Sequence, residues 1–292
     1  MQPFEGRYNT DGPWFKGNTH VHTTVSDGAL DYRDTAAFYA EWGYDFLFVT
    51  DHQRAADIEK LDGLPLLALN GIEIDGRDDA GAYYHVVALG FDGPVDNAAP
   101  FVARIEQAKK AGAVVVVAHP CWTGNSVEEV LRHEFDGVEI YNNICHYLNG
   151  KSLAPFHYDR MLEQDVRTLA FSVDDAHLQA GQTYDGGWIM VSAPSATKED
   201  ILLGITSGNF YSTQGPRFES IRFGDGKVSV RTSPVLAVRM TDNTSWGKRV
   251  YRGGEAITEA EFSVTEERAY VRLEIEDDAG RLAWTNAVLR AG

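Results

Sequence analysis

Two patterns of apolar and polar residues divide the chain. In its first two-thirds, short apolar runs alternate with segments whose apolar residues recur at helical spacing. The predicted strands cover a segment around His20 and residues 46–50, 66–71, 113–118, 137–141, 168–173 and 188–191. The predicted helices cover residues 32–42, 100–111, 126–133 and 155–164, the third with a capping box from Ser126 to Glu129. This alternation predicts about seven βα units, whose parallel strands close or nearly close into a barrel.

The pattern changes at about Pro216. Apolar and polar residues then alternate one by one, at residues 221–223, 227–230, 237–240 and 270–275. Turn-forming pairs such as Asp225-Gly226 and Gly253-Gly254 separate these runs. We therefore expect a barrel domain over residues 1–215 and a small antiparallel, β-sandwich-like module over residues 216–292.

Composition narrows the range of partners. A net charge of −17 disfavours binding to nucleic-acid polymers or anionic membranes through a broad basic face. It leaves room for a small phosphorylated substrate, because bound cations can reverse the field inside one pocket. No run of eighteen apolar residues and no basic-then-apolar N-terminal segment occurs, so neither a membrane span nor an ordinary secretion signal is expected. The oligomeric state is not encoded in these features.

The two cysteines, Cys121 and Cys145, are too few for a disulfide framework and lack zinc-ribbon spacing. This usage suits a reducing compartment, and we expect a cytoplasmic protein. Cys121 lies two residues after His119, so a nucleophilic role is one interpretation and packing beside the pocket is the other.

Histidines and carboxylates mark the ends of the predicted strands. His20 and His22 project from the same side of a strand, because side chains repeat every two residues, and Asp175 and His177 repeat that spacing. The other candidates are Asp27, His52, Glu73, His85 and His119. Taken singly, each is explained as a core residue or a helix cap. Together they predict one metal centre, because a barrel gathers the carboxyl ends of its strands at one face.

The order of these motifs resembles the PHP (polymerase and histidinol phosphatase) superfamily over roughly residues 14–215. The matching segments are 17–22, 27–28, 50–52, 71–73, His85, 119–120 and 175–177. The resemblance implies a distorted (β/α)7 barrel with a two- or three-metal site that holds Mn, Fe or Zn. Segments 141–143, 157–160 and 283–286 resemble a subgroup with a C-terminal β module, either carbaryl-hydrolase-like or nucleotide-phosphoesterase-like.

The resemblance also implies how the donors are shared between the metals. The first metal would be held by His20, His22, Glu73 and Asp175. The second would be held by Glu73, His85 and His119. The third would be held by Asp27, His52 and His177. Glu73 can bridge two cations because its carboxylate has two oxygens.

Hydrolysis follows from such a centre, because divalent cations activate water and stabilise negative charge. The leading hypothesis is a phosphoesterase that cleaves a small phosphorylated substrate with a metal-bound hydroxide. His177 or Asp51 would relay protons, although Asp51 is equally suited to orienting His52. Candidate substrate contacts are Arg54, Tyr141, His146, Lys151 and Arg217.

Two other functions remain open. The same metals could hydrolyse a carbonyl centre such as a carbamate, ester or amide, which fits the shortage of basic residues near the motifs. A non-catalytic, metal-stabilised binding protein is the minor alternative, and a closed metal shell without an exchangeable position would favour it.

Overall fold

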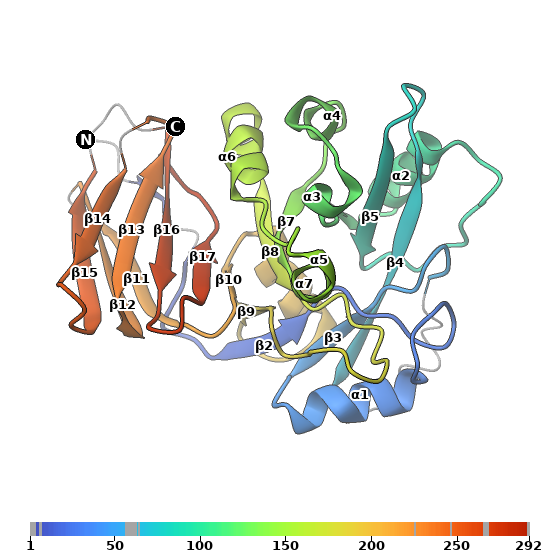
Figure 1. The fold of residues 1–292 in the computed structure, drawn as a ribbon, viewed down its shortest axis with the longest axis horizontal. Helices are drawn as coiled ribbons and strands as arrows, with labels where there is room; N and C mark the ends of the chain where they lie inside the picture. Colours follow the sequence, from blue (N-terminus) through green and yellow to red (C-terminus); the bar gives the residue numbers. More distant parts are fainter. Residues whose placement is uncertain are drawn as a thin grey trace.

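The computed structural model describes residues 4–5, 8–55, 63, 65–224, 226–245, 247–264 and 269–290. Helices and strands alternate in the first two-thirds of the chain, whereas the last third is built from strands (Figure 1). The helices are α1 (Tyr32–Glu41), α2 (Phe101–Lys110), α3 (Pro120–Thr123), α4 (Val127–Leu131), α5 (Asn143–Asn149), α6 (Pro155–Gln164) and α7 (Lys198–Thr206). The predicted helices correspond to α1, α2, α4 and α6, and the capping box of Ser126 and Glu129 is confirmed.

The strands of the first two-thirds of the chain all belong to one large sheet. They are β1 (Phe4–Glu5), β2 (Trp14–Asn18), β3 (Phe46–Val49), β4 (Leu67–Arg77), β5 (Tyr83–Leu89), β6 (Val114–Val117), β7 (Gly137–Asn142), β8 (Leu169–Val173), β9 (Trp188–Ser192) and β10 (Phe210–Thr213). Their hydrogen-bonded order runs β10-β9-β2-β3-β4-β5-β6-β7-β8. The fold is thus mixed α/β around one large sheet.

The expectation of a parallel sheet is wrong at four of the strand pairings in this order. β5 is antiparallel to both β4 and β6, and β9 is antiparallel to both β2 and β10. Only residues 78–82 connect β4 to β5, which is too short for a helical crossover and forces a hairpin. Asp78 holds this turn, because its Oδ1 accepts the backbone N–H groups of Ala80 and Ala82, each at 3.0 Å.

A seam between β8 and β10 is bridged by side chains in place of a backbone ladder. The hydroxyl of Ser212 accepts the N–H of Ser172 at 2.8 Å and donates to the carbonyl of Ala170 at 2.8 Å. The hydroxyl of Ser172 donates to the carbonyl of Thr213 at 3.0 Å. The sheet order therefore has β8 and β10 at its two ends in this region without direct pairing, and a closed barrel stays a prediction.

Asn286, from the end of the chain, completes the seam. Its Oδ1 accepts the N–H of Ala170 in β8 at 2.9 Å, and its Nδ2 donates to the carbonyls of Gly208 and Phe210 at 3.2 and 2.9 Å. The N–H of Asn286 donates to the hydroxyl of Tyr8 at 2.6 Å. Buried backbone groups that a ladder would satisfy are satisfied here by side chains.

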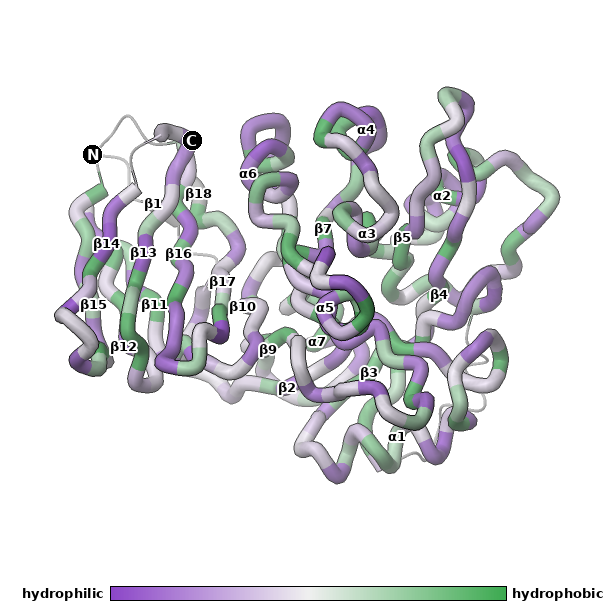
Figure 2. Tube along the Cα trace, viewed as in Figure 1, coloured by the Kyte–Doolittle hydropathy of each residue, from purple (hydrophilic) through white to green (hydrophobic). Residues whose placement is uncertain are grey.

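The last third of the chain forms antiparallel strands, as predicted. They are β11 (Phe218–Gly224), β12 (Lys227–Val235), β13 (Ala237–Asp242), β14 (Lys248–Tyr251), β15 (Ile257–Ser263), β16 (Tyr270–Glu276), β17 (Leu282–Thr285) and β18 (Val288–Arg290). Hydrophobic and hydrophilic residues alternate along them (Figure 2). The Gly253-Gly254 turn lies between β14 and β15, whereas Asp225 lies outside the described residues.

Hydrogen bonding continues across residue 215, where a domain boundary is predicted. β17 pairs with β10, so the strands of the last third extend the large sheet, while β11, β12 and β15 form a separate three-stranded sheet. The guanidinium of Arg272 in β16 binds both carboxylate oxygens of Asp159 in α6, at 2.6 and 2.8 Å. Among the described residues, no helix is long and apolar enough to cross a membrane.

Candidate metal centre

The nine sequence-predicted donors meet at one place in the fold. Most lie at or beyond the carboxyl ends of β2, β3, β6 and β8, while Glu73 and His85 face this place from the β4–β5 hairpin. They form four overlapping groups, in each of which one donor atom per residue lies within 4.8 Å of the others. The groups are His22, Asp27, His52 and His177; His20, His22 and Glu73; His20, His119 and Asp175; and His52, Glu73 and His85. The cluster is thus capable of binding metal.

The carboxylate of Glu73 occupies the middle of the cluster. Its Oε2 lies 3.2 Å from His20 Nε2, 3.3 Å from His22 Nε2 and 3.2 Å from His52 Nδ1. Its Oε1 lies 2.7 Å from His85 Nδ1 and 3.4 Å from His119 Nε2. One carboxylate therefore divides five imidazoles between its two oxygens, which is the arrangement a bridging ligand requires.

Asp175 brings a second carboxylate to the same donors. Its Oδ1 lies 3.3 Å from His20 Nε2 and 3.1 Å from His22 Nε2, and its Oδ2 lies 3.7 Å from His119 Nε2. The two Nε2 atoms of His20 and His22 are themselves 3.1 Å apart. Donors held about 2.1 Å from one cation lie about 3.0 to 3.4 Å from each other, so most of these spacings fit a shared cation.

These groups differ from the sharing that the family resemblance implies. His52 lies with Glu73 and His85 as well as with Asp27 and His177, and His119 lies with His20 and Asp175. The Oδ2 of Asp27 is 3.2 Å from His177 Nε2 and 3.9 Å from His52 Nε2. The side chain of Asp27 is 53% exposed, compared with 1% for Glu73, so this outer group opens toward solvent.

Backbone conformation at the cluster is unusual for residues other than glycine. The φ angles of Gln53, His119 and Asp175 are 57°, 28° and 53°. Residues held in this sparsely populated region cost free energy, and they concentrate at functional sites. The chain turns sharply after β3, β6 and β8, which directs the adjacent donors inward.

Glu139 is a residue that sequence reasoning missed. It lies in β7 with its side chain buried, and its Oε1 is 2.6 Å from His20 Nδ1. Its Oε2 accepts the N–H of His119 at 2.9 Å and the Nδ2 of Asn142 at 2.8 Å. When His20 Nδ1 donates to Glu139, His20 Nε2 is left as the free lone pair that faces Glu73 and Asp175. The available signal was a carboxylate in the middle of a strand predicted to be buried.

Asp51 is buried beneath the loop that carries Asp27. Its Oδ1 accepts the N–H of Thr23 at 2.8 Å and both the N–H and the hydroxyl of Ser26 at 3.1 and 2.7 Å. Its Oδ2 accepts the hydroxyl of Thr23 at 2.7 Å. These bonds occupy both oxygens and direct Asp51 toward the loop at residues 23–26 and not toward His52.

Carboxylates control the protonation of the central histidines. Burial opposes protonation of His20, but Asp175, Glu73 and Glu139 outweigh burial and raise its pKa well above the ordinary value. Burial likewise opposes ionisation of Glu73, yet His20 and His119 hold its pKa well below the usual range. The cluster thus strongly favours carboxylates paired with positive charge, which protons or metal cations can supply.

One buried nitrogen atom among the donors supports metal binding. The Nδ1 of His52 is buried without a hydrogen-bond partner among the described residues, although Glu73 Oε2 is 3.2 Å away. A buried polar atom without a partner is costly unless a ligand satisfies it. Mixed imidazole and carboxylate donors suit Zn, Mn and Fe, so the residues fit divalent cations.

The predicted substrate contacts are not among the grouped donors. Arg54, His146, Lys151 and Arg217 are exposed, whereas Tyr141 is buried and donates to Asn143 Oδ1 at 3.2 Å. In the described part of the chain, none of the five forms a hydrogen bond, ion pair or ring contact with a donor. Burial raises the pKa of the Cys121 thiol, and its Sγ lies 3.1 Å from the carbonyl of Leu153, which favours packing over nucleophilic chemistry.

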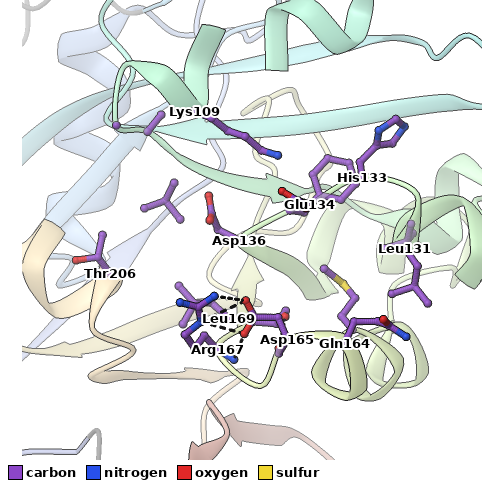
Figure 3. A pocket seen from close by; sticks show the side chains of 17 residues that line it. Lys109, Leu131, His133, Glu134, Asp136, Gln164, Asp165, Arg167, Leu169 and Thr206 are labelled. Carbon is purple, nitrogen blue, oxygen red and sulfur yellow. Dashed lines mark hydrogen bonds and ion pairs between the residues drawn. The ribbon is translucent and has the colours of Figure 1, made fainter. Parts of the chain in front are cut away.

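A cavity of about 980 Å³ lies at the other ends of β6, β7 and β8. Ala113, Asp136 and Thr168, which precede these strands, line it. Figure 3 shows the guanidinium of Arg167 bound to Asp165 at its wall. None of the nine donors lines this cavity, so it is separate from the candidate metal centre.

Comparison with known proteins places the fold. No family model matches the chain, and no curated protein matches its sequence. Its structure is similar to a two-domain protein from Bacteroides vulgatus that contains a "predicted PHP-like metal-dependent phosphoesterase". The similarity covers 99% of this chain and 98% of that one, with a TM-score of 0.56 and 13% sequence identity. The chain therefore shares the fold of that two-domain protein.

Two further structures match more weakly than this two-domain PHP protein. A candidate metal-dependent phosphoesterase from Bifidobacterium adolescentis is 18% identical, with a TM-score of 0.42, over 57% of this chain and 89% of that one. An amidohydrolase from Chromobacterium violaceum, with bound sulfate and no metal, is 18% identical, with a TM-score of 0.24, over 67% and 65% of the two chains. At sequence identities this low, the similarity shows the fold alone.

Proposed function

We propose that this protein is a metal-dependent hydrolase, and that its nine clustered donors hold two or three divalent cations. The position of Glu73 carries the proposal, because its two oxygens lie among five imidazole nitrogens at 2.7 to 3.4 Å. Glu73 would hold cations through both of its oxygens. Asp27, with His52 and His177, belongs to the outer, solvent-facing group, whose exposure argues against a closed structural site.

Bound divalent cations would lower the pKa of water and stabilise negative charge on the substrate. The chain's own residues contribute position and proton transfer. His177 Nδ1 lies 3.1 Å from the carbonyl of Asp175, so donation there leaves Nε2 free to act as a ligand or to hold a proton beside Asp27. Asp51 is a positioning residue, because it fixes the loop that carries Asp27.

The preferred reaction is hydrolysis of a small phosphoester. The outer donors are accessible, and a cation cluster compensates for the shortage of basic side chains beside them. Hydrolysis of a carbamate, ester or amide is the second candidate. It is favoured by the carboxylates at the opening, Asp27 and Asp75, which disfavour a highly anionic substrate unless cations offset them.

Metal analysis by plasma mass spectrometry and a hydrolysis screen, before and after Mn reconstitution, test this function. The substrates are p-nitrophenyl phosphate, bis-p-nitrophenyl phosphate, p-nitrophenyl acetate and an aryl carbamate. Two or three metals per chain with phosphoester turnover is the expected result. Carbonyl turnover alone would select the second candidate, and neither metal nor activity after reconstitution would refute the proposal.

A further inference from the structure

Trp122 stands beside the candidate metal centre as a large, partly uncovered apolar side chain. It lies in α3, directly after the turn that places His119. Its ring centroid is 5.7 Å from that of His85 and 5.1 Å from that of His119, with interplanar angles of 74° and 80°. The residue is 37% exposed. It therefore contacts two candidate ligands and still presents apolar surface to solvent.

One edge of the cluster, at His85 and His119, lies next to Trp122. Side chains of the innermost donors, such as His20 and His22, are fully buried, whereas those of His85 and His177 are 10% and 17% exposed. His85 is thus a slightly exposed donor whose ring contacts that of Trp122. A molecule that reached the cluster past His85 would lie along the indole.

One further exposed apolar side chain, that of Leu153, belongs to the segment that contacts α3 through Cys121. Leu153 is 43% exposed, and its carbonyl accepts from the Cys121 thiol, which fixes the segment at residues 150–154 against α3. The charge of Lys151 acts on the same thiol and partly offsets the rise in its pKa that burial causes. The Trp122 wall, defined as Trp122 and Leu153 with Lys151 nearby, is therefore apolar with one cationic neighbour.

We propose that the Trp122 wall is a subsite for a planar apolar group of the substrate, so that the enzyme prefers aryl esters to short alkyl esters. This inference rests on the proposed hydrolase function. An aromatic group on the wall buries indole surface that water now covers, while the scissile group lies over the donors beside it. A short alkyl group would be too small to cover the indole.

A paired series of esters tests the subsite. Phenyl phosphate and ethyl phosphate are compared in the metal-loaded wild type and in Trp122→Phe, Trp122→Leu and Trp122→Ala. We expect Trp122→Ala to raise KM for phenyl phosphate about tenfold with little change for ethyl phosphate, and Trp122→Phe to keep most of the preference. The control is Trp42→Leu, which removes an exposed tryptophan at the end of α1.

Binding measurements separate the subsite from catalysis. Calorimetry with phenylphosphonate and methylphosphonate, which are not hydrolysed, should show an affinity loss in Trp122→Ala for phenylphosphonate alone, at unchanged metal content. Equal losses for both ligands, or a loss of metal, would overturn the proposal and show that Trp122 only holds the imidazoles in place. If wild type is an active hydrolase without aryl preference, the subsite alone fails. If wild type neither binds nor hydrolyses any probe, the hydrolase proposal fails with it.

Discussion

The donor cluster and the seam between β8 and β10 are both buried and polar, but their polar atoms are paired differently. At the seam, each donor finds an acceptor: Ser172, Ser212 and Asn286 bond backbone groups at 2.8 to 3.2 Å. In the cluster, lone-pair nitrogens face each other and face carboxylates, as the 3.1 Å between His20 Nε2 and His22 Nε2 shows. Buried polar groups whose hydrogen-bond donors and acceptors match each other stabilise a fold. Buried polar groups that need an added cation indicate a function.

The largest effect should come from Glu73→Ala, because it removes the carboxylate shared by five imidazoles. We expect metal content to fall by about two equivalents and hydrolysis by about a thousandfold or more. Plasma mass spectrometry and the substrate screen measure both. Asp27→Ala should reduce only the outer group, and Glu134→Gln, an exposed change at the far cavity, should alter neither. Unchanged metal content in Glu73→Ala would contradict the bridging role.

Glu139→Gln tests whether Glu139, which lies behind His20, contributes to metal binding. The amide keeps an acceptor for the His119 N–H but loses the charge that orients His20. Metal affinity should drop about 10- to 100-fold, the usual effect of losing a carboxylate behind a histidine ligand. Competition with a chromophoric chelator measures it. An affinity equal to that of wild type would place Glu139 among purely structural residues.

Asn286→Ala breaks the seam. It leaves the N–H of Ala170 and the carbonyls of Gly208 and Phe210 without the amide that now satisfies them. Unfolding free energy should fall by about 2 to 4 kcal/mol, measured by urea titration, while the folded fraction keeps its metal content. Gln164→Ala, an exposed change at the end of α6, is the matched control. If Asn286→Ala lost metal but kept its unfolding free energy, the seam would serve metal binding and not stability, which would contradict the comparison.

The smallest effect concerns Asp78, a buried carboxylate already paired with protein cations. Burial opposes ionisation of Asp78, but Arg132, the N–H of Ala82 and His133 lower its pKa to about 2. A depressed pKa stabilises the fold above the unfolded value near 4 and loses that contribution as pH falls toward 2. Asp78→Asn should lower the unfolding free energy by at most about 1 kcal/mol at neutral pH, since Arg132 is partly exposed. It should also weaken the fall of that free energy as the pH becomes acidic. Stability curves at pH 2 to 6 would show an unchanged slope if the pairing were irrelevant.

Local patterns predicted most helices and strands because burial and period leave a direct trace in sequence. The nine candidate donors were predicted for a related reason, since most of them follow or interrupt an apolar run. The antiparallel placement of β5 was not predicted, although the short connection at residues 78–82 was a signal for it. Glu139 and Asn286 could not be assigned, because their partners lie 119 and 116 residues away in His20 and Ala170.

Trp122 illustrates a different limit. Its sequence neighbours, Cys121 and His119, drew attention to chemistry, while an aromatic residue in a helix of 4 residues carries no periodic signal. Only the folded chain shows that its ring meets His85 and His119. Substrate choice depends on such non-periodic side chains, which is why the reaction class was easier to infer from sequence than the substrate.

The seam also sets an order of events during synthesis of the chain. Asn286 joins β8 and β10, and it bonds Tyr8 from 278 residues earlier in the sequence. Until Asn286 has left the ribosome, the edges of β8 and β10 lack the side-chain amide that joins them, even if the earlier helices have already formed. The turn after β8 carries Asp175 and His177, so a nascent chain would hold its full set of donors in place only after Asn286 has been synthesised.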